Sequence, residues 1–117
     1  MIEKYTEIFI QEDLELIKKN PLNIKNVSKQ TEEMCLIAVK ENWLALQFCK
    51  EQTREVCLAA LEQDEHAFCL IREQTPELCE FAVRKNWEIL RWVESQTSEL
   101  RMIAYEQNPK AEKYFKL

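Results

Sequence analysis

Apolar residues recur along this chain at helical spacing, in a pattern that restarts every 22 residues. The dipeptide Gln-Thr opens each full repeat, at Gln30-Thr31, Gln52-Thr53, Gln74-Thr75 and Gln96-Thr97. A fixed period in this range is typical of repeat architectures, in which each unit buries its apolar face against its neighbours. No segment shows the apolar–polar alternation of a strand over a useful length.

The unit at 74–95 predicts two short helices, over 76–85 and 87–94. Thr75 is a suitable N-cap for the first helix, and Pro76 fits its first position. Asn86 is predicted to cap the second helix, because every full unit carries Asn or Asp at this position. The residues predicted to face inward are Leu78, Phe81, Ala82 and, in some units, those at the positions of Cys79 and Val83 in the first helix, and Ile89, Leu90, Trp92 and Val93 in the second.

Three further residue types keep fixed positions in the full units. Alanine recurs in the first helix, at Ala38, Ala60, Ala82 and Ala104, and predicts close approach of neighbouring helices. The repeated glutamines, Gln30, Gln52, Gln74 and Gln96, are interpreted as interhelix hydrogen-bonding groups. The glutamates Glu33, Glu55, Glu77 and Glu99 suit the positive ends of the helix dipoles, and together they could form an acidic ridge.

These patterns predict an all-α fold, a short α-solenoid of about five two-helix repeats of 22 residues, forming one domain over 1–117. Central repeats occupy 30–51, 52–73 and 74–95, and 96–117 is a C-terminal cap repeat. Residues 1–29 form an N-terminal cap and a degenerate repeat whose core pattern is kept by Leu14, Leu16, Ile17, Ile24 and Val27. The apolar residues expected to cover the open end are Tyr5, Ile8, Phe9 and Ile10. Polar residues such as Arg101 in the outermost units lead us to expect a complete chain.

Charge and composition exclude several function classes. The net charge is −5, and residues 30–95 hold thirteen acids against seven bases, which disfavours binding to nucleic acid or an anionic membrane. The chain has no glycine, which argues against phosphate-cradling loops. No apolar run approaches the roughly 20 residues of a membrane span. The N-terminus lacks the layout of a signal peptide, so a cytoplasmic location is expected.

The five cysteines are expected to be reduced thiols, because their number is odd and no secretion signal precedes them. Cys35, Cys57 and Cys79 share one position of the unit and are predicted to pack in the core. Cys69 is predicted to face solvent, because polar residues occupy its position in the other full units. With His66 three residues earlier, a metal or reactive-thiol role near Cys69 is an alternative, although two ligands do not make a metal site. We therefore predict no metal, no cofactor and no catalytic residues.

The candidate partner-binding residues are Trp43, Trp87, Glu65 and Glu88. The two tryptophans begin the predicted second helices of their units. One interpretation is that each ring lies over the adjoining unit, and the other is that the pair anchors a protein partner, since tryptophan is enriched in binding hot spots. The choice between packing and anchoring stays open at this point.

Two segments carry a resemblance to a known family. Glu33-Met-Cys-Leu-Ile-Ala-Val with Asn42-Trp-Leu-Ala-Leu-Gln-Phe, and Glu55-Val-Cys-Leu-Ala-Ala-Leu, resemble the short tandem repeats of the family called domain of unknown function 4116. The resemblance is good over 30–95, partial over 96–117 and weak over 8–29. It implies a helical-repeat fold, no enzymatic activity and no functional residues to transfer. The chain differs in carrying Trp43, Glu65, Trp87 and Pro109 where the family often has glycine.

The function predicted from these features is that of a non-enzymatic protein-interaction module. An alternative is a viral or bacterial inhibitor that presents carboxylates to a basic, nucleic-acid-binding partner. A third hypothesis, from a different class, is a thiol- or metal-dependent activity near His66 and Cys69.

Overall fold

Helices of two kinds alternate along the chain in the computed structural model, which describes the backbone of residues 2–117 and the side chains of residues 7–117. The α-helices are α1 (Ile2–Lys19), α2 (Glu32–Glu41), α3 (Arg54–Gln63), α4 (Pro76–Lys85) and α5 (Ser98–Gln107). Each is followed by a 3₁₀ helix: η1 (Pro21–Asn26), η2 (Trp43–Phe48), η3 (Glu65–Leu70), η4 (Trp87–Trp92) and η5 (Pro109–Tyr114). The described residues contain no strand, which confirms the predicted all-α repeat fold.

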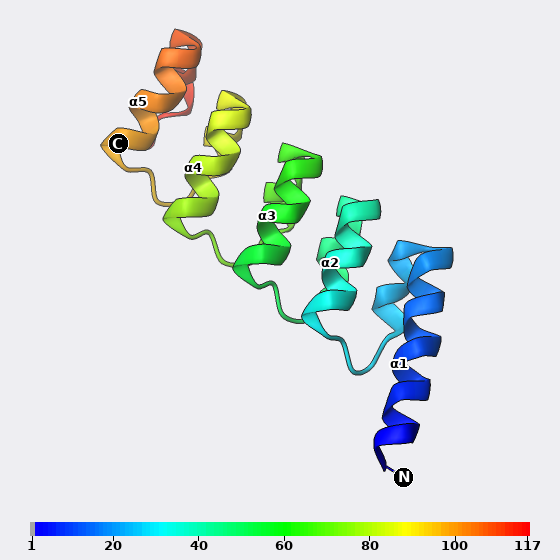
Figure 1. Cartoon of the computed structure of the whole chain (residues 1–117). Helices are drawn as coiled ribbons and strands as arrows, with labels where there is room; N and C mark the ends of the chain where they lie inside the picture. Colours follow the sequence, from blue (N-terminus) through cyan, green and yellow to red (C-terminus); the bar gives the residue numbers. More distant parts are fainter. Residues whose placement is uncertain (1) are drawn as a thin grey trace.

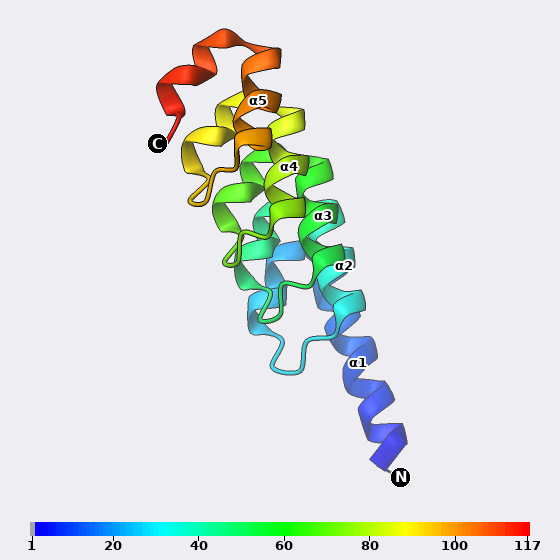
Figure 2. The same ribbon diagram turned by 90° about the vertical axis from the view of Figure 1, so that its left-hand side faces the viewer.

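The five helix pairs stack into an elongated solenoid of 60 × 22 × 16 Å. The α-helices line one side and the 3₁₀ helices the other, and the two described ends of the chain lie at opposite ends of the stack (Figures 1 and 2). Within the described residues, helices contact each other only inside one unit or between adjacent units. Stability is therefore a sum of unit and nearest-neighbour contributions, as expected of a solenoid.

Capping side chains start the α-helices at the predicted residues. The hydroxyl oxygens of Thr31, Thr53, Thr75 and Thr97 each accept a hydrogen bond from the backbone N–H three residues later, at 3.1–3.3 Å. The predicted helix over 76–85 matches α4 at both ends. Local sequence thus determines where the α-helices begin.

One amide or carboxylate side chain joins the two helices of each unit. The Oδ1 atoms of Asn42, Asp64, Asn86 and Asn108 accept from the backbone N–H two residues later at 2.8–3.0 Å. The backbone N–H of the same residue donates to the alanine carbonyl four residues earlier, so it also ends the α-helix. The N-cap prediction is confirmed, but the second helix is a 3₁₀ helix. In the 74–95 unit it ends at Trp92 rather than 94, because Val93 is already extended.

We expect Asn86→Ala to lower the free energy of unfolding by about 1 kcal/mol, the usual cost of losing an N-cap. A denaturant titration followed by circular dichroism measures this change. Asn86→Ser is the matched control, since serine also caps helices and should preserve most of the stability. An Asn86→Ala midpoint equal to that of the wild type would contradict the capping role.

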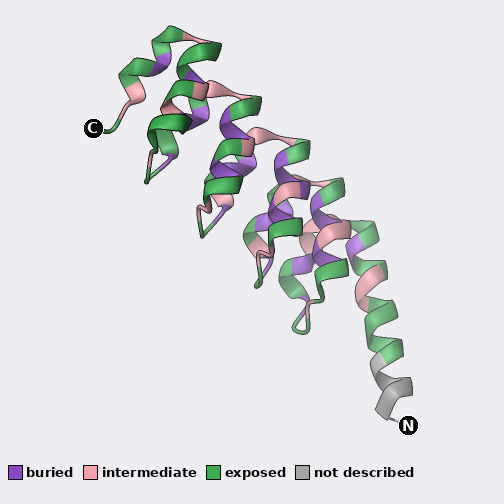
Figure 3. Cartoon of the chain, turned by 60° about the vertical axis from the view of Figure 1, so that its left-hand side comes forward, coloured by how far each residue is buried: buried purple, intermediate pink, exposed green. Residues whose placement is uncertain are grey.

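The core is a continuous column of apolar residues between the units. Buried residues recur in both helices of every unit (Figure 3). The repeated alanines are completely buried, at 0% exposure: Ala38, Ala60, Ala82 and Ala104. The core prediction is wrong for two residues. Trp92 is 38% exposed, and Leu16 is 42% exposed because no described unit precedes it in the stack.

The repeated glutamines join successive 3₁₀ helices, as the sequence predicts. Gln52 Nε2 donates to Leu46 O at 3.1 Å in the preceding unit and to Leu70 O at 2.9 Å in its own unit. Its Oε1 accepts from Arg72 N at 2.9 Å. Gln30 and Gln96 make the same three bonds in their units, and Gln74 makes the last two. In its own unit each glutamine satisfies a carbonyl that the short helix leaves unpaired, such as Leu70 O. The carbonyl of the preceding unit, such as Leu46 O, also accepts from a backbone N–H.

The N-terminal half of α1 extends beyond the stack (Figure 1). Ile8 is 53%, Phe9 56% and Ile10 36% exposed, so the expectation that they cover the open end is wrong. The side chain of Tyr5 lies outside the described residues. The stack is instead closed at this end by the C-terminal half of α1, where Ile17 is buried.

Candidate functional site

Three hollows follow one edge of the solenoid, where the inter-unit loops meet the first turns of the α-helices. Their volumes are about 670, 510 and 340 Å³, and the largest is lined by α4, α5 and the loops that precede them. Because the loops repeat in register, side chains from two or three successive units line each hollow.

The largest hollow is strongly acidic, and we name it the glutamate groove. Five exposed glutamates line it: Glu73 and Glu94 from loops, Glu77 and Glu80 from α4, and Glu99 from α5. Arg72 is its one basic residue, and apolar parts of Pro76, Leu100 and Ile103 contribute to its wall. The groove thus combines an apolar surface with carboxylates from two loops and two helices.

Not all of these carboxylates are free to meet a ligand. Glu77 Oε1 pairs with Arg54 Nε at 2.6 Å, and Glu80 Oε1 with Arg84 at 3.1 Å. Glu73, Glu94 and Glu99 have no ion pair within the described part of the chain.

Charge distinguishes the glutamate groove from the smallest hollow. The hollow of about 340 Å³ is lined by two acids, Glu32 and Glu51, and by two bases, Lys29 and Lys50, so its charges balance. Only at the C-terminal end of the edge do the acids greatly outnumber the bases. The sequence predicts the acidic excess of the central units, but not that four of their glutamates line one groove together with Glu99.

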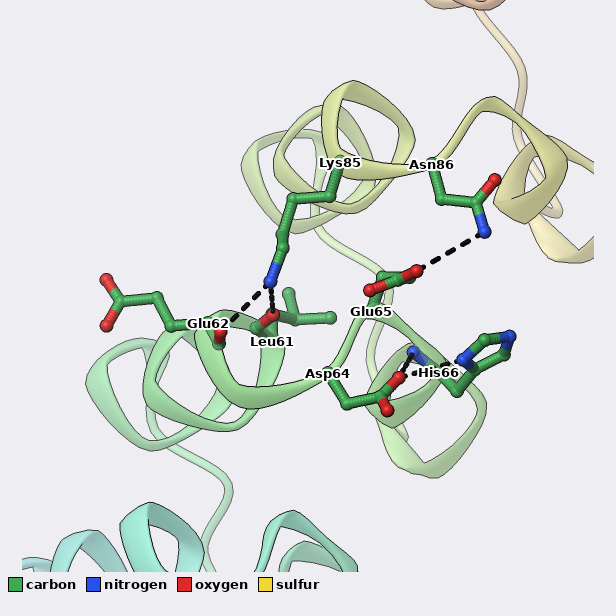
Figure 4. Close-up of polar contacts among 7 residues, drawn as sticks. All are labelled: Leu61, Glu62, Asp64, Glu65, His66, Lys85 and Asn86. Atoms are coloured by element: carbon green, nitrogen blue, oxygen red, sulfur yellow. Dashed lines mark hydrogen bonds and ion pairs between the residues drawn. The ribbon is translucent and has the colours of Figure 1, made fainter.

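The predicted partner-binding residues lie at a different edge, where the α-helices end and the 3₁₀ helices begin. Trp87 is half-buried and stacks on Tyr114 of the next unit, with ring centroids 6.1 Å apart. Trp43 is half-buried against the core. Glu65 Oε1 accepts from Asn86 Nδ2 at 3.4 Å (Figure 4), whereas Glu88 is exposed. None of the four lines any of the three hollows, and the Trp87–Tyr114 contact favours packing over anchoring.

His66 lies beside carboxylates of the same corner. Asp64, Glu65 and His66 place potential ligand atoms within 4.8 Å of one another, and Cys69 is not part of this cluster. In this arrangement Asp64 Oδ1 accepts from the His66 backbone N–H and contacts His66 Nδ1, both at 2.8 Å. The Glu65 carboxylate points at Asn86 of the next unit (Figure 4). The cluster therefore joins His66 to two carboxylates and not to Cys69, the residue with which the sequence pairs it.

The Asp64 carboxylate is stabilised in its ionised form. The hydrogen bond from the His66 backbone N–H, with a smaller contribution from the His66 side chain, lowers the pKa of Asp64. A lowered pKa in the folded state means that the contribution to stability is present at neutral pH and is lost as the pH falls through the pKa of the folded protein.

The cysteines divide as predicted, with one pair that the sequence did not reveal. Cys35, Cys57 and Cys79 are buried and Cys69 is exposed. Cys49 is also buried, and its thiol donates to Ala45 O at 3.5 Å. The interaction between the Cys35 and Cys49 thiols lowers the pKa of Cys35 and raises that of Cys49. Partial burial raises the pKa of the Cys69 thiol, so at neutral pH it is protonated and a weak nucleophile.

We expect iodoacetamide to label Cys69 alone in the native protein, and the four buried cysteines only after unfolding. Labelling of Cys69 should be slow at neutral pH and faster as the pH rises, because the thiolate is the reacting form. Peptide mapping by mass spectrometry identifies the modified residues. Native labelling should disappear in Cys69→Ser, and rapid native labelling of Cys57 or Cys79 would contradict their placement in the core.

Comparison with known proteins gives one match. The family model described as Domain of unknown function (DUF4116) matches residues 14–54, which confirms the resemblance seen in the sequence. The match begins inside the segment whose resemblance is weak and ends at Arg54, the first residue of α3. No curated protein and no solved structure matches the chain. No helix among the described residues is long and apolar enough to cross a membrane.

Proposed function

We propose that this protein is a non-enzymatic protein-interaction module, and that its glutamate groove binds a basic segment of a partner protein. The observation that carries the proposal is the gathering of five glutamates and one arginine around a groove of about 670 Å³. The elements that hold these side chains are fixed by caps and glutamine hydrogen bonds. A groove built on such elements loses little conformational entropy when a ligand binds.

Electrostatics supports a cationic ligand. Unit charges about 4 Å apart attract by roughly 4 kcal/mol at the effective dielectric constant of about 20 near a protein surface. Several carboxylates around one groove add their fields, and the same fields repel phosphates, so nucleic acid is not the expected ligand. A partner that uses its basic segment to bind nucleic acid would be blocked by this contact, which is the inhibitor form of the proposal.

Fluorescence anisotropy with a labelled hexa-arginine peptide tests the proposal. We expect hexa-arginine to bind with an affinity that falls as salt rises, because exposed charges are screened beyond about 8 Å at physiological ionic strength. Hexa-citrulline, which has nearly the same shape without the charge, should not bind.

Variants locate the binding surface. The double variant Glu73→Gln/Glu99→Gln should weaken hexa-arginine binding at least tenfold, because neither carboxylate has a partner within the described chain. Glu12→Gln/Glu15→Gln removes the same charge from exposed positions of α1, away from the groove, and should change the affinity less than twofold. Equal weakening by the two double variants, or equal binding of hexa-citrulline, would contradict the proposal.

A further inference from the structure

At three of the junctions between units, a basic side chain donates a hydrogen bond to a carbonyl in the loop of the preceding unit. Lys50 Nζ donates to Ser28 O at 2.9 Å, and Lys116 Nζ donates to Val93 O at 3.0 Å. Arg72 Nη2 donates to Lys50 O at 3.1 Å and also to Cys49 O. In each case a cation reaches a carbonyl 22 or 23 residues earlier, in the loop of the preceding unit. We call this contact the loop clamp of Lys50, Arg72 and Lys116.

The carbonyls of the loop clamp are good cation acceptors. Cys49 and Val93 directly follow η2 and η4, at the negative ends of these short helices. Their carbonyls have no helical partner and need a donor from elsewhere. A lysine or arginine that reaches across from the next unit meets this need and neutralises the partial negative charge.

In the unit at 74–95, Glu94 stands at the position equivalent to Lys50, Arg72 and Lys116. The carbonyls that a basic residue would reach from position 94, by the same spacing, are those of Ile71 and Arg72. Within the described residues no hydrogen bond reaches either carbonyl. This junction has a carboxylate where the other three have a cation, and both Arg72 and Glu94 line the glutamate groove.

We propose that the glutamate groove anchors its partner through one lysine or arginine side chain that takes the place of the missing loop clamp. Its ammonium or guanidinium group donates to the Ile71 and Arg72 carbonyls and pairs with Glu94. This inference rests on the proposed function and names the chemical group that the groove recognises. The other three junctions are the template, because constant stacking of 22-residue units gives the loops the same arrangement at each step.

The variant Glu94→Lys tests the anchor by supplying the clamp from within the chain. We expect its side chain to reach the Ile71 and Arg72 carbonyls, to raise the denaturant midpoint, and to weaken hexa-arginine binding at least tenfold. Glu94→Gln removes the charge without filling the place, so it should weaken binding less than Glu94→Lys does. The control Glu106→Lys makes the same charge change at an exposed position of α5 that does not line the groove, and should change affinity less than twofold.

The outcomes separate the inference from the function on which it rests. If the Glu73→Gln/Glu99→Gln variant weakens hexa-arginine binding but Glu94→Lys weakens it no more than Glu106→Lys, the anchor is overturned and the groove stands. If the wild type does not bind hexa-arginine, the proposed function fails, and the anchor fails with it. A crystal structure of Glu94→Lys with Nζ away from both carbonyls also overturns the anchor, independently of any peptide.

Discussion

Replacing Gln52 with leucine is expected to lower the free energy of unfolding by about 2–4 kcal/mol, one of the two largest single-residue effects that we predict. A typical hydrogen bond contributes about 0.5–1.5 kcal/mol net, and each shielded group left without a partner costs about 1–3 kcal/mol. Gln52 makes three bonds, two as donor to carbonyls of η2 and η3 and one as acceptor from the Arg72 backbone. Leucine fills a similar volume but satisfies none of these groups.

The consequence should extend beyond the mutated residue, because Gln52 joins two units. A stack held by nearest-neighbour contacts loses cooperativity when one junction weakens. Hydrogen exchange should then show that the units on the two sides of Gln52 open with different free energies, whereas the wild-type units open together. Denaturant titration gives the total loss of stability.

Gln47→Leu is the matched control for this change. Gln47 is exposed, and its Nε2 donates only to Leu44 O within the same short helix, at 3.0 Å. Its replacement should alter stability by no more than about 0.5 kcal/mol, as is usual for surface positions. If Gln52→Leu costs no more than Gln47→Leu, the glutamines are not what joins the units.

Ala60→Leu is the second change for which we expect a large loss, of about 1–3 kcal/mol. Ala60 has 0% exposure and lies in α3, which packs against α2 and α4. A larger side chain has no space there unless neighbouring units move apart, and such a movement would strain the Gln52 hydrogen bonds. Thermal or denaturant unfolding measures the loss.

The adjacent position provides an internal control. Ala59 is also buried, but the equivalent residues of the other full units are Ile37, Phe81 and Ile103. Space for a larger side chain therefore exists at this position of the fold, and Ala59→Ile should leave stability unchanged or raise it slightly. Equal losses for Ala60→Leu and Ala59→Ile would show that the alanine position is not specially restricted.

The 22-residue sequence pattern determined most of the fold, because the signals that define it are local. A threonine oxygen caps a backbone N–H three residues away, and an asparagine caps one two residues away, so the start of each helix depends on few neighbours. The same locality explains why the bounds of α4 were predicted correctly. The glutamine role was also predictable, since a polar residue that recurs among apolar helices needs buried partners.

Only the tertiary structure decided how the units meet and what their loops present. Leu16 and Val27 follow the same core pattern, yet one is exposed and the other buried, because burial depends on whether a neighbouring unit is present. The 3₁₀ form of the second helices and the Cys35–Cys49 contact are set by the space between packed elements. The glutamate groove combines residues of two loops and two helices, whose proximity depends on the stacking of whole units rather than on sequence neighbours.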